Sequence, residues 1–276
     1  MLIAHISDLH IARPGEKAYG IAPTAENLAC CVDHINQLQP EPDLVLVTGD
    51  ITYSGLLQEA ERAANILAQL HAPFFVLPGN HDVRSNLNIA FGGEACPITD
   101  QGFIQYVIEG YPLRLIGIDS TAPGEPGGEI CTPRAAWLDA RLSEAKEQPT
   151  VIFMHHPPLK CGVLETDEDG FVGVDLFGKI IEKYSNIQSI LCGHIHLQAH
   201  AGWRGTVVSI APSMGIPLVL DLTLEQPSQF TLDAPGYQLH YWSPDENLIS
   251  HTIYVRETDG PYLFEDLQET IYLANK

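Results

Sequence analysis

The chain has 276 residues, of which 45% are hydrophobic and 18% are charged, so it is long and apolar enough to bury a sizeable core. Its 35 acidic residues against 14 basic ones give a formal net charge of -21. This balance disfavours binding to a nucleic-acid polymer or to an anionic membrane surface. It would also repel an anionic substrate unless bound divalent cations supplied positive charge in the site.

The six cysteines form no C-x-x-C pair and no spacing typical of a disulfide-rich secreted domain. We expect them to be thiols in a reducing compartment. The first residues lack the basic segment of a signal peptide and reach Asp8 too soon. No apolar run approaches the roughly 18–20 residues that a membrane span requires. The expectation is therefore a soluble, cytoplasmic protein that does not bind membranes.

Apolar runs and helical periodicity predict strands and helices that alternate along much of the chain. Segments 84–102 and 159–173 look irregular. We find no internal repeat and no second domain, so we expect one domain over residues 1–276, in which residues 212–276 complete the fold or form a subunit interface. The expected strands are 2–6, 44–47, 74–77, 103–108, 113–118, 150–154, 188–192, 206–210, 237–242 and 248–255, and the expected helices are 24–38, 56–70, 133–142 and 175–184.

Five of these strands share one feature, because each ends in a short segment that contains Asp, Asn or His. In open α/β sheets the carboxyl ends of the strands are where ligands bind. Asp, Asn and His without Cys suit borderline-hard divalent ions, and their number suits two ions that share one carboxylate. The segments are Asp8-x-His10, Gly49-Asp50, Gly79-Asn80-His81-Asp82, His155-His156 and Gly193-His194-x-His196.

Each segment also has a plain structural interpretation. Asp8 and His10 are two residues apart, so extended backbone would point both side chains to one side, but a surface turn fits the pattern too. Asp50 could be the N-cap of the helix expected from residue 56. In the pair His155-His156, extended backbone would turn the two rings to opposite sides. Five such coincidences in a chain with 12 histidines favour the metal site.

In order and residue type, the five segments resemble the motif set of the calcineurin-like metallophosphoesterase superfamily. The resemblance covers most of residues 1–210, and it implies an α/β fold, a four-layer α/β-β/α sandwich with metals at the carboxyl ends of the strands. Within the superfamily, the loop 15–20 and the block 153–158 are similar to class III cyclic-nucleotide phosphodiesterases and the related glycerophosphodiesterases. Residues 230–237 are similar to the bacterial cyclic-AMP phosphodiesterase branch.

The resemblance implies two divalent metal ions, Mn, Fe, Zn or Co, and a set of residues that hold them. It also implies that His81 contacts the phosphate and protonates the leaving oxygen, with Asn80 and Tyr19 as further candidates for substrate contact. His156 is expected to support a ligand or to be structural, Asp82 to support its turn, and His5 and His200 to be packed or solvated. The first ion would take Asp8, His10, Asp50 and His196, and the second would take Asp50, Asn80, His155 and His194.

The implied activity is hydrolysis of a small phosphodiester, a 3′,5′-cyclic nucleotide such as cyclic AMP or a glycerophosphodiester, by in-line attack of a hydroxide between the two ions. A phosphodiester carries one negative charge and needs no arginine clamp, and neither Arg62 nor Arg84 occupies a family position. The alternatives are another hydrolase with the same site, such as a nucleotide pyrophosphatase or phosphomonoesterase, and a non-catalytic scaffold. The family further implies a homodimer or higher homo-oligomer.

Overall fold

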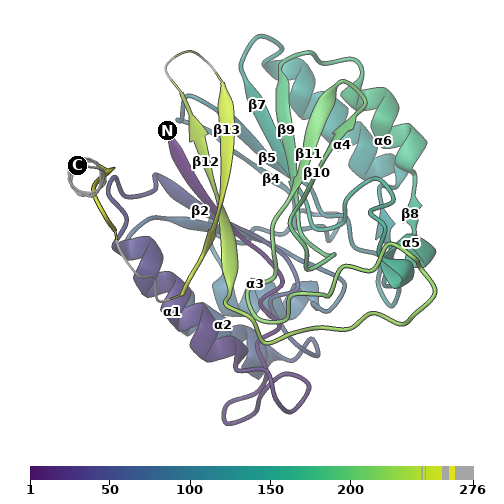
Figure 1. Ribbon diagram of the computed structural model, residues 1–276. Helices are drawn as coiled ribbons and strands as arrows, with labels where there is room; N and C mark the ends of the chain where they lie inside the picture. The colour runs from purple at the N-terminus through teal and green to yellow at the C-terminus, as the bar shows by residue number, and fades with distance from the viewer. Residues whose placement is uncertain (244, 246, 257–260, 265–276) are drawn as a thin grey trace, which may run out of the picture.

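The computed structural model describes residues 1–276 except 244, 246, 257–260 and 265–276. Two large β-sheets face each other, and helices cover their outer sides (Figure 1). The predicted four-layer α/β-β/α sandwich is confirmed. None of the helices in the described part of the chain is long and apolar enough to span a lipid bilayer.

The first sheet joins the two ends of the described chain. Three adjacent strands, β1, β2 and β3, are parallel, and the hairpin near the C-terminus extends the sheet by antiparallel pairing of β12 with β1, in which Leu2 lies opposite Tyr241. Residues 236–242 and 248–254 are thus part of this sheet. The strand order is β13 (Leu248–Tyr254), β12 (Gly236–Trp242), β1 (Leu2–Ile6), β2 (Leu44–Thr48) and β3 (Phe74–Leu77).

The second sheet is built from the middle of the chain, and its four inner strands β11, β9, β7 and β5 are parallel. A separate short parallel pair is formed by β6 (Gly128–Glu129) and β8 (Phe171–Val172). The order in the second sheet is β10 (Ala199–Trp203), β11 (Thr206–Ile210), β9 (Ile187–Cys192), β7 (Thr150–Phe153), β5 (Arg114–Gly117) and β4 (Tyr106–Ile108).

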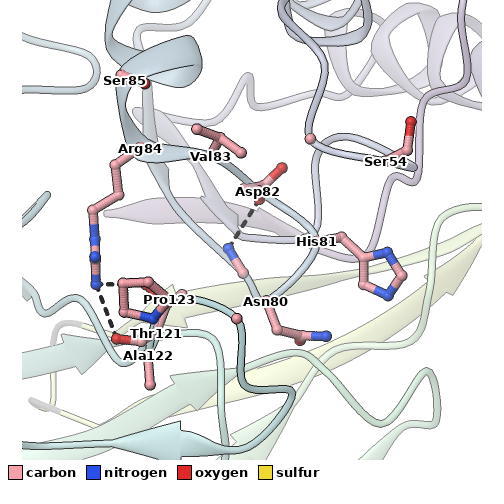
Figure 2. Close-up of a pocket in the computed structure, with 13 residues that line it drawn as sticks. Ser54, Asn80, His81, Asp82, Val83, Arg84, Ser85, Thr121, Ala122 and Pro123 are labelled. Carbon is pink, nitrogen blue, oxygen red and sulfur yellow. Dashed lines mark hydrogen bonds between the residues drawn. The ribbon is translucent and has the colours of Figure 1, made fainter.

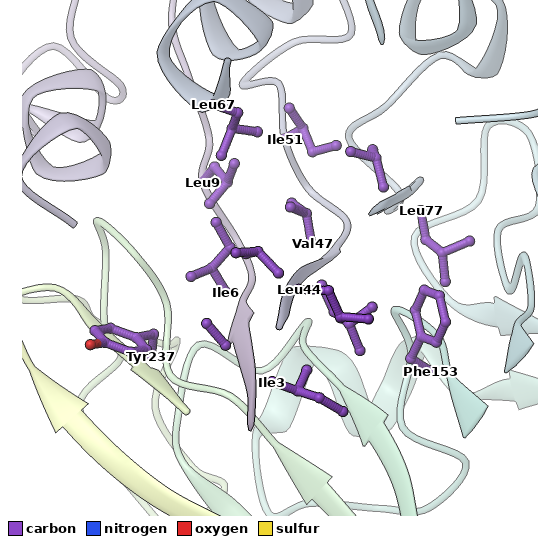
Figure 3. Close-up of a cluster of buried hydrophobic side chains, with 14 of the residues drawn as sticks. Ile3, Ile6, Leu9, Leu44, Val47, Ile51, Leu67, Leu77, Phe153 and Tyr237 are labelled. Carbon is purple, nitrogen blue, oxygen red and sulfur yellow. The ribbon is translucent and has the colours of Figure 1, made fainter. Parts of the chain in front are cut away.

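Alternation along the strands explains why the sheets are covered on both sides. In β7, Val151 and Phe153 belong to the core cluster that they share with the first sheet and its helices, whereas Ile152 belongs to the cluster that contains residues of α4 and α6. Figure 3 shows Phe153 in one cluster with Val47 of β2 and Leu67 of α2. The helices are α1 (Thr24–Asn36), α2 (Leu57–Leu67), α3 (Arg84–Phe91), α4 (Thr132–Glu144), α5 (Leu164–Asp169) and α6 (Val174–Ile181).

Two local expectations were wrong, and one alternative is excluded. Residues 84–102 and 159–173 are not wholly irregular, since they contain α3 and α5. The strand expected at 103–108 is limited to β4, because Phe103 and Ile104 turn away to bond the loops around Thr99 and Asp119. Asp50 is not a helix N-cap: α2 begins at Leu57, after a turn whose amide groups bond the carboxylate of Glu59.

Candidate metal centre and substrate cleft

The carboxyl ends of β1, β2, β3, β7 and β9 meet at one edge of the two facing sheets, and the five sequence segments lie there. Asp8, His10, Asp50 and His196 form a first cluster, with ligand-capable atoms all within 4.8 Å of one another. The Nε2 atoms of His10 and His196 are 3.0 Å apart. Asp50 Oδ2 lies 3.6 Å from His10 Nε2, and Asp8 Oδ1 lies 3.6 Å from His196 Nε2.

A second cluster adjoins the first through Asp50. His155 Nε2 lies 3.5 Å from Asp50 Oδ2 and 3.1 Å from Asn80 Oδ1, and the ring of His194 lies 5.0 Å from that of His155 between centroids. The same carboxylate oxygen of Asp50 therefore approaches ring nitrogens of both clusters. The structure brings together all seven residues that the sequence nominated as metal ligands.

The atoms in these clusters have the spacing of ligands around a cation. Two ligand atoms that each lie about 2.1 Å from one ion are separated by about 3.0–3.4 Å at octahedral or tetrahedral angles. Burial lowers the pKa of His10 well below its usual value and that of His194 to about 3, so both rings keep a free lone pair. His10 Nδ1 is buried without a hydrogen-bond partner. This donor set fits divalent metal ions.

Neighbouring backbone groups orient the rings toward the centre of the clusters. His155 donates from Nδ1 to the Thr48 carbonyl at 2.7 Å, and His196 donates from Nδ1 to the Ile216 carbonyl at 2.9 Å. Each bond leaves Nε2 as the nitrogen that faces the site. Burial lowers the pKa of His155, but the carboxylate of Asp50 outweighs it and raises the pKa to about 9.

The backbone at the strand ends is left-handed at most of the candidate ligands. Five of the eight non-glycine residues with positive φ in the described chain belong to the clusters, and such backbone is uncommon outside sites that require it. The extended backbone expected at Asp8 and His10 is therefore wrong, although both side chains do reach the site. The five are Asp8 (φ 56°), His10 (φ 44°), Asp50 (φ 48°), His194 (φ 76°) and His196 (φ 55°).

The glycines in the motifs make room for the ligands of neighbouring strands. A Cβ on Gly79 would lie 2.2 Å from Asp50 Oδ1 and 2.3 Å from its backbone nitrogen. A Cβ on Gly193 would lie 1.8 Å from Ser7 Oγ and 2.8 Å from Asp8 Oδ2. Close packing between adjacent strand ends, rather than a special turn, explains these two glycines.

His156 lies beside His155 on the same side, with ring centroids 4.7 Å apart, so the expectation that the two rings face opposite ways is wrong. The chain bends at this pair instead of remaining extended. His156 Nδ1 bonds Ser120 Oγ at 2.9 Å, and Nε2 bonds the Pro126 carbonyl at 3.1 Å. The ligand-capable nitrogens of His155, His156 and His194 lie within 4.8 Å of one another, but both nitrogens of His156 bond other groups, so we regard it as a support of the site.

Asp82 is half-buried and joins two strand ends. Its carboxylate accepts hydrogen bonds from the amides of Ile51, Thr52 and Gly79, and from the Thr52 hydroxyl at 2.7 Å. Burial and the neighbouring Asp50 raise its pKa to about 6. Asp82 thus holds the Gly79–Asp82 turn against the end of β2, as expected from the sequence.

His81 lines a cleft of about 530 Å³ beside the second cluster (Figure 2). Its Nδ1 bonds the Tyr53 carbonyl at 3.0 Å, and its amide donates to Asp50 Oδ1 at 2.9 Å. Tyr19 does not line this cleft; it packs on Tyr53 with ring centroids 5.0 Å apart and is 48% exposed. Burial and the neighbouring Tyr53 and Asp50 raise the pKa of Tyr19, so its phenol lies near the site without lining this cleft.

The opposite wall of the cleft contains residues that the sequence did not nominate. Arg84 lies there, held by a bidentate ion pair with the buried Asp119 at 2.6 and 3.1 Å and by the Thr121 hydroxyl at 2.7 Å. Asp119 follows β5 just as Asp50 follows β2, so the same signal at the end of a strand would have pointed to it. The cleft is lined by Ser54, Gly55, Gly79–Ser85 and Thr121–Gly124.

A family model for the calcineurin-like phosphoesterases matches residues 1–198. The chain belongs to this family. It is 34% identical to the probable glycerophosphodiester phosphodiesterase GpdQ of Arcobacter nitrofigilis over 265 residues, covering 96% of this chain and 97% of that protein. It is 28% identical to the 3′,5′-cyclic adenosine monophosphate phosphodiesterase CpdA of Escherichia coli, covering 86% and 83%.

Solved structures agree with this calcineurin-like fold. A dimetal phosphatase from Danio rerio superimposes with a TM-score of 0.65 at 16% identity, covering 93% of this chain and 99% of that one. The predicted membership of the class III phosphodiesterase group is confirmed by the similarity to GpdQ and CpdA proteins. The chain is a metal-dependent phosphodiesterase of the calcineurin-like family, and hence a hydrolase.

Proposed function

We propose that this chain hydrolyses small phosphodiesters, with glycerophosphodiesters preferred to 3′,5′-cyclic nucleotides, at a centre of two divalent ions. The observation that carries the dinuclear centre is the position of Asp50 Oδ2, within 3.6 Å of ring nitrogens from both clusters. A single carboxylate oxygen with this position suits the ligand shared by two ions.

Seven residues divide between the two ions in this proposal. Asn80 supplies a neutral oxygen, so it adds no negative charge that would weaken the field on the phosphate. When bound, the ions lower the pKa of water and neutralise charge on the phosphate oxygens. The first ion is assigned to Asp8, His10, Asp50 and His196, and the second to Asp50, Asn80, His155 and His194.

His81 is the proposed proton donor to the leaving oxygen. Its bond to the Tyr53 carbonyl requires the proton on Nδ1, which leaves Nε2 to face the cleft. Its amide bond to Asp50 Oδ1 ties its position to the metal centre. A histidine fixed in this way holds a proton at Nε2, when protonated, within reach of a diester bound between the ions and the cleft.

The chemistry of the cleft supports a polyol as the leaving alcohol. Hydroxyls of Ser54, Ser85 and Thr121 and the guanidinium of Arg84 line it, and no Phe, Tyr or Trp is among its lining residues. Hydroxyl and amide groups bind a glycerol moiety by hydrogen bonds, whereas a nucleobase is usually held by stacking on an aromatic ring. The similarity to GpdQ proteins over nearly the whole chain supports the same preference.

A panel of substrates tests the preference. We expect kcat/KM for glycerophosphocholine and glycerophosphoethanolamine to exceed that for cyclic AMP, and an aryl phosphodiester to exceed its monoester. The expectation for the aryl substrates follows from the charge of Arg84. Asp119 already balances this charge, so the guanidinium offers little attraction to the second negative charge of a monoester. A higher kcat/KM for cyclic AMP would reverse the assigned preference, and a higher value for the monoester would make the chain a phosphomonoesterase.

The metal identity, the location and the assembly are further parts of this proposal. Sites of Asp, Asn and His accept Mn, Fe, Co or Zn. All six cysteines are free thiols, which supports a reducing, cytoplasmic location. Exposed apolar side chains in the segment 219–232 support a homodimer or higher homo-oligomer, because such side chains favour a protein interface.

A further inference from the structure

A chain of buried polar side chains crosses the first sheet beneath the metal centre. His240 Nδ1 lies 2.7 Å from Ser250 Oγ, and His240 Nε2 lies 3.3 Å from His5 Nδ1. His5 Nε2 in turn lies 2.8 Å from Thr48 Oγ1. The chain therefore passes through four adjacent strands, from β13 through β12 and β1 to β2.

Thr48 connects this chain to the candidate metal ligands. Its side chain bonds His5, and its carbonyl oxygen accepts the Nδ1 proton of His155 at 2.7 Å. It is also the last residue of β2, two positions before Asp50. A displacement of Thr48 would therefore move the ring of His155 and the backbone that leads to Asp50.

The two histidines of the chain are uncharged and fully paired. Both are 0% exposed, and burial lowers the pKa of His5 to about 3 and that of His240 well below its usual value. With one proton on each ring, donation in a single direction along the chain satisfies every bond from Ser250 to Thr48. Buried polar groups cost free energy unless they are fully bonded, and a fully bonded network fixes the positions of its members.

We propose that Ser250, His240, His5 and Thr48 form a positioning relay that sets the orientation of His155 and thereby the affinity of the second metal ion. The relay rests on the proposed dinuclear function, in which His155 is a ligand. Groups that hydrogen-bond the distal nitrogen of a ligating histidine fix the direction of its metal-binding lone pair. Here that group is the Thr48 carbonyl, and the relay holds Thr48 in place.

The test is a Co²⁺ titration of the metal-free full-length chain, followed by the visible absorption of the bound ion and by calorimetry. We expect the wild type to bind two equivalents. Thr48→Val removes the hydroxyl at nearly constant volume, and we expect it to weaken the second equivalent about 10–100-fold while the first keeps its affinity. The absorption bands of the second equivalent should shift as well, since the orientation of its histidine changes.

Two matched variants separate positioning from general destabilisation. Thr150→Val removes another buried strand threonine hydroxyl, which bonds the Gln148 carbonyl at 2.9 Å away from the relay, and it should leave both Co²⁺ affinities unchanged. Thr48→Ser keeps a hydroxyl and should restore the second site. Thermal midpoints of Thr48→Val and Thr150→Val, measured without metal, show whether the two changes are equally disruptive. Equal Co²⁺ affinities in these two variants would overturn the relay.

Ser250→Ala tests the far end of the chain with a small change at a partly exposed residue. If the four residues form a relay, Ser250→Ala weakens the binding of the second Co²⁺ equivalent by a smaller factor than Thr48→Val does. The double variant that combines Ser250→Ala with Thr48→Val then binds the second equivalent as tightly as Thr48→Val alone. If the double variant lost affinity by the product of the two single-variant factors, Ser250 and Thr48 would act independently, and the relay would be overturned. A wild type that binds fewer than two equivalents would overturn the dinuclear function itself, whereas two equivalents insensitive to Thr48→Val would overturn the relay while the function stands.

Discussion

Single residues at this site serve two purposes at once. Asp50 offers Oδ2 to the ring nitrogens of His10 and His155, and its other oxygen accepts the amide of His81. Burial opposes the ionisation of Asp50, but the surrounding histidines, His155 foremost, hold its pKa well below the usual value. One carboxylate thus links the metal ligands to the proposed proton donor, so a change in metal content and a change in proton transfer have to be measured separately.

Replacing His81 separates these two effects. We expect His81→Ala to lower kcat for a glycerophosphodiester about 10²–10⁴-fold, the usual contribution of a general acid, while two metal ions per chain remain. Metal content by mass spectrometry and steady-state kinetics check this. His200→Ala, which removes an exposed histidine on β10, is the matched control and should change neither quantity. Loss of an ion from His81→Ala would instead assign His81 as a metal ligand.

At the scale of elements, the ends of neighbouring strands approach each other so closely that the contact leaves no room for a side chain. Gly79 approaches Asp50 so closely that an added Cβ would lie 2.3 Å from the Asp50 backbone nitrogen. We expect Gly79→Ala to lower the free energy of unfolding by at least about 1–3 kcal/mol, the range for overpacking, and to reduce the bound metal because Asp50 is displaced. Urea denaturation and metal analysis measure both.

The control for this substitution is Gly202→Ala on β10. An added Cβ at Gly202 meets nothing within 4 Å, and its backbone does not require glycine, so we expect no loss of stability or metal. If Gly79→Ala unfolds at the same urea concentration as Gly202→Ala and keeps two ions, the close approach of the strand ends does not constrain the site.

The strands and the identity of their terminal residues could be predicted from the sequence, whereas the backbone that aims the side chains could not. Asp8 and His10 were nominated by alternation in extended backbone, yet both have left-handed φ. His155 and His156 were expected to diverge, but a bend places both rings on one side. The alternation of side chains predicts their direction within an extended strand. It does not predict their direction beyond the end of the strand, because the backbone turn there depends on contacts with neighbouring strands.

The cleft was harder to foresee than the metal centre. Arg84 belongs to α3, a helix of eight residues whose apolar positions are too few for a clear helical period. Its partner Asp119 follows β5 of the second sheet, so their pairing depends on how the two sheets pack. Local patterns contain no information on such packing, which explains why the sequence motifs nominate candidate metal ligands but not the residues of the opposite wall of the cleft.

At the scale of the whole molecule, the site exists only where the two sheets meet. Asp8, Asp50 and Asn80 follow strands of the first sheet, whereas His155 and His194 follow strands of the second. The backbone amide of His194 also donates to both carboxylate oxygens of Asp8, 186 residues away in the chain. The candidate ligands therefore come from both sheets, and we expect metal binding to be coupled to the packing of the sandwich, as it is coupled to folding in other proteins.

Exposed aliphatic side chains in one segment of the chain predict that copies of the protein associate. The segment 219–232, which we name the apolar strap, exposes five aliphatic side chains, and several exposed apolar side chains in one segment favour a protein interface. With a net charge of -21, two copies would repel each other elsewhere on the surface, so an apolar contact is the favoured place to meet. The five are Val219 (46% exposed), Leu220 (60%), Leu222 (69%), Leu224 (40%) and Leu232 (53%).

Substitutions within the apolar strap test this prediction. We expect the wild type to be a dimer or higher oligomer by light scattering coupled to size exclusion, and the double variant Leu220→Asp with Leu222→Asp to be a monomer at the same concentration, because a buried unpaired carboxylate is costly. Val172→Asp is the matched control, since Val172 is 66% exposed on β8, outside the strap, and it should leave the oligomer intact. A wild type that is monomeric at micromolar concentration, or a double variant that still assembles, would contradict an interface at the strap.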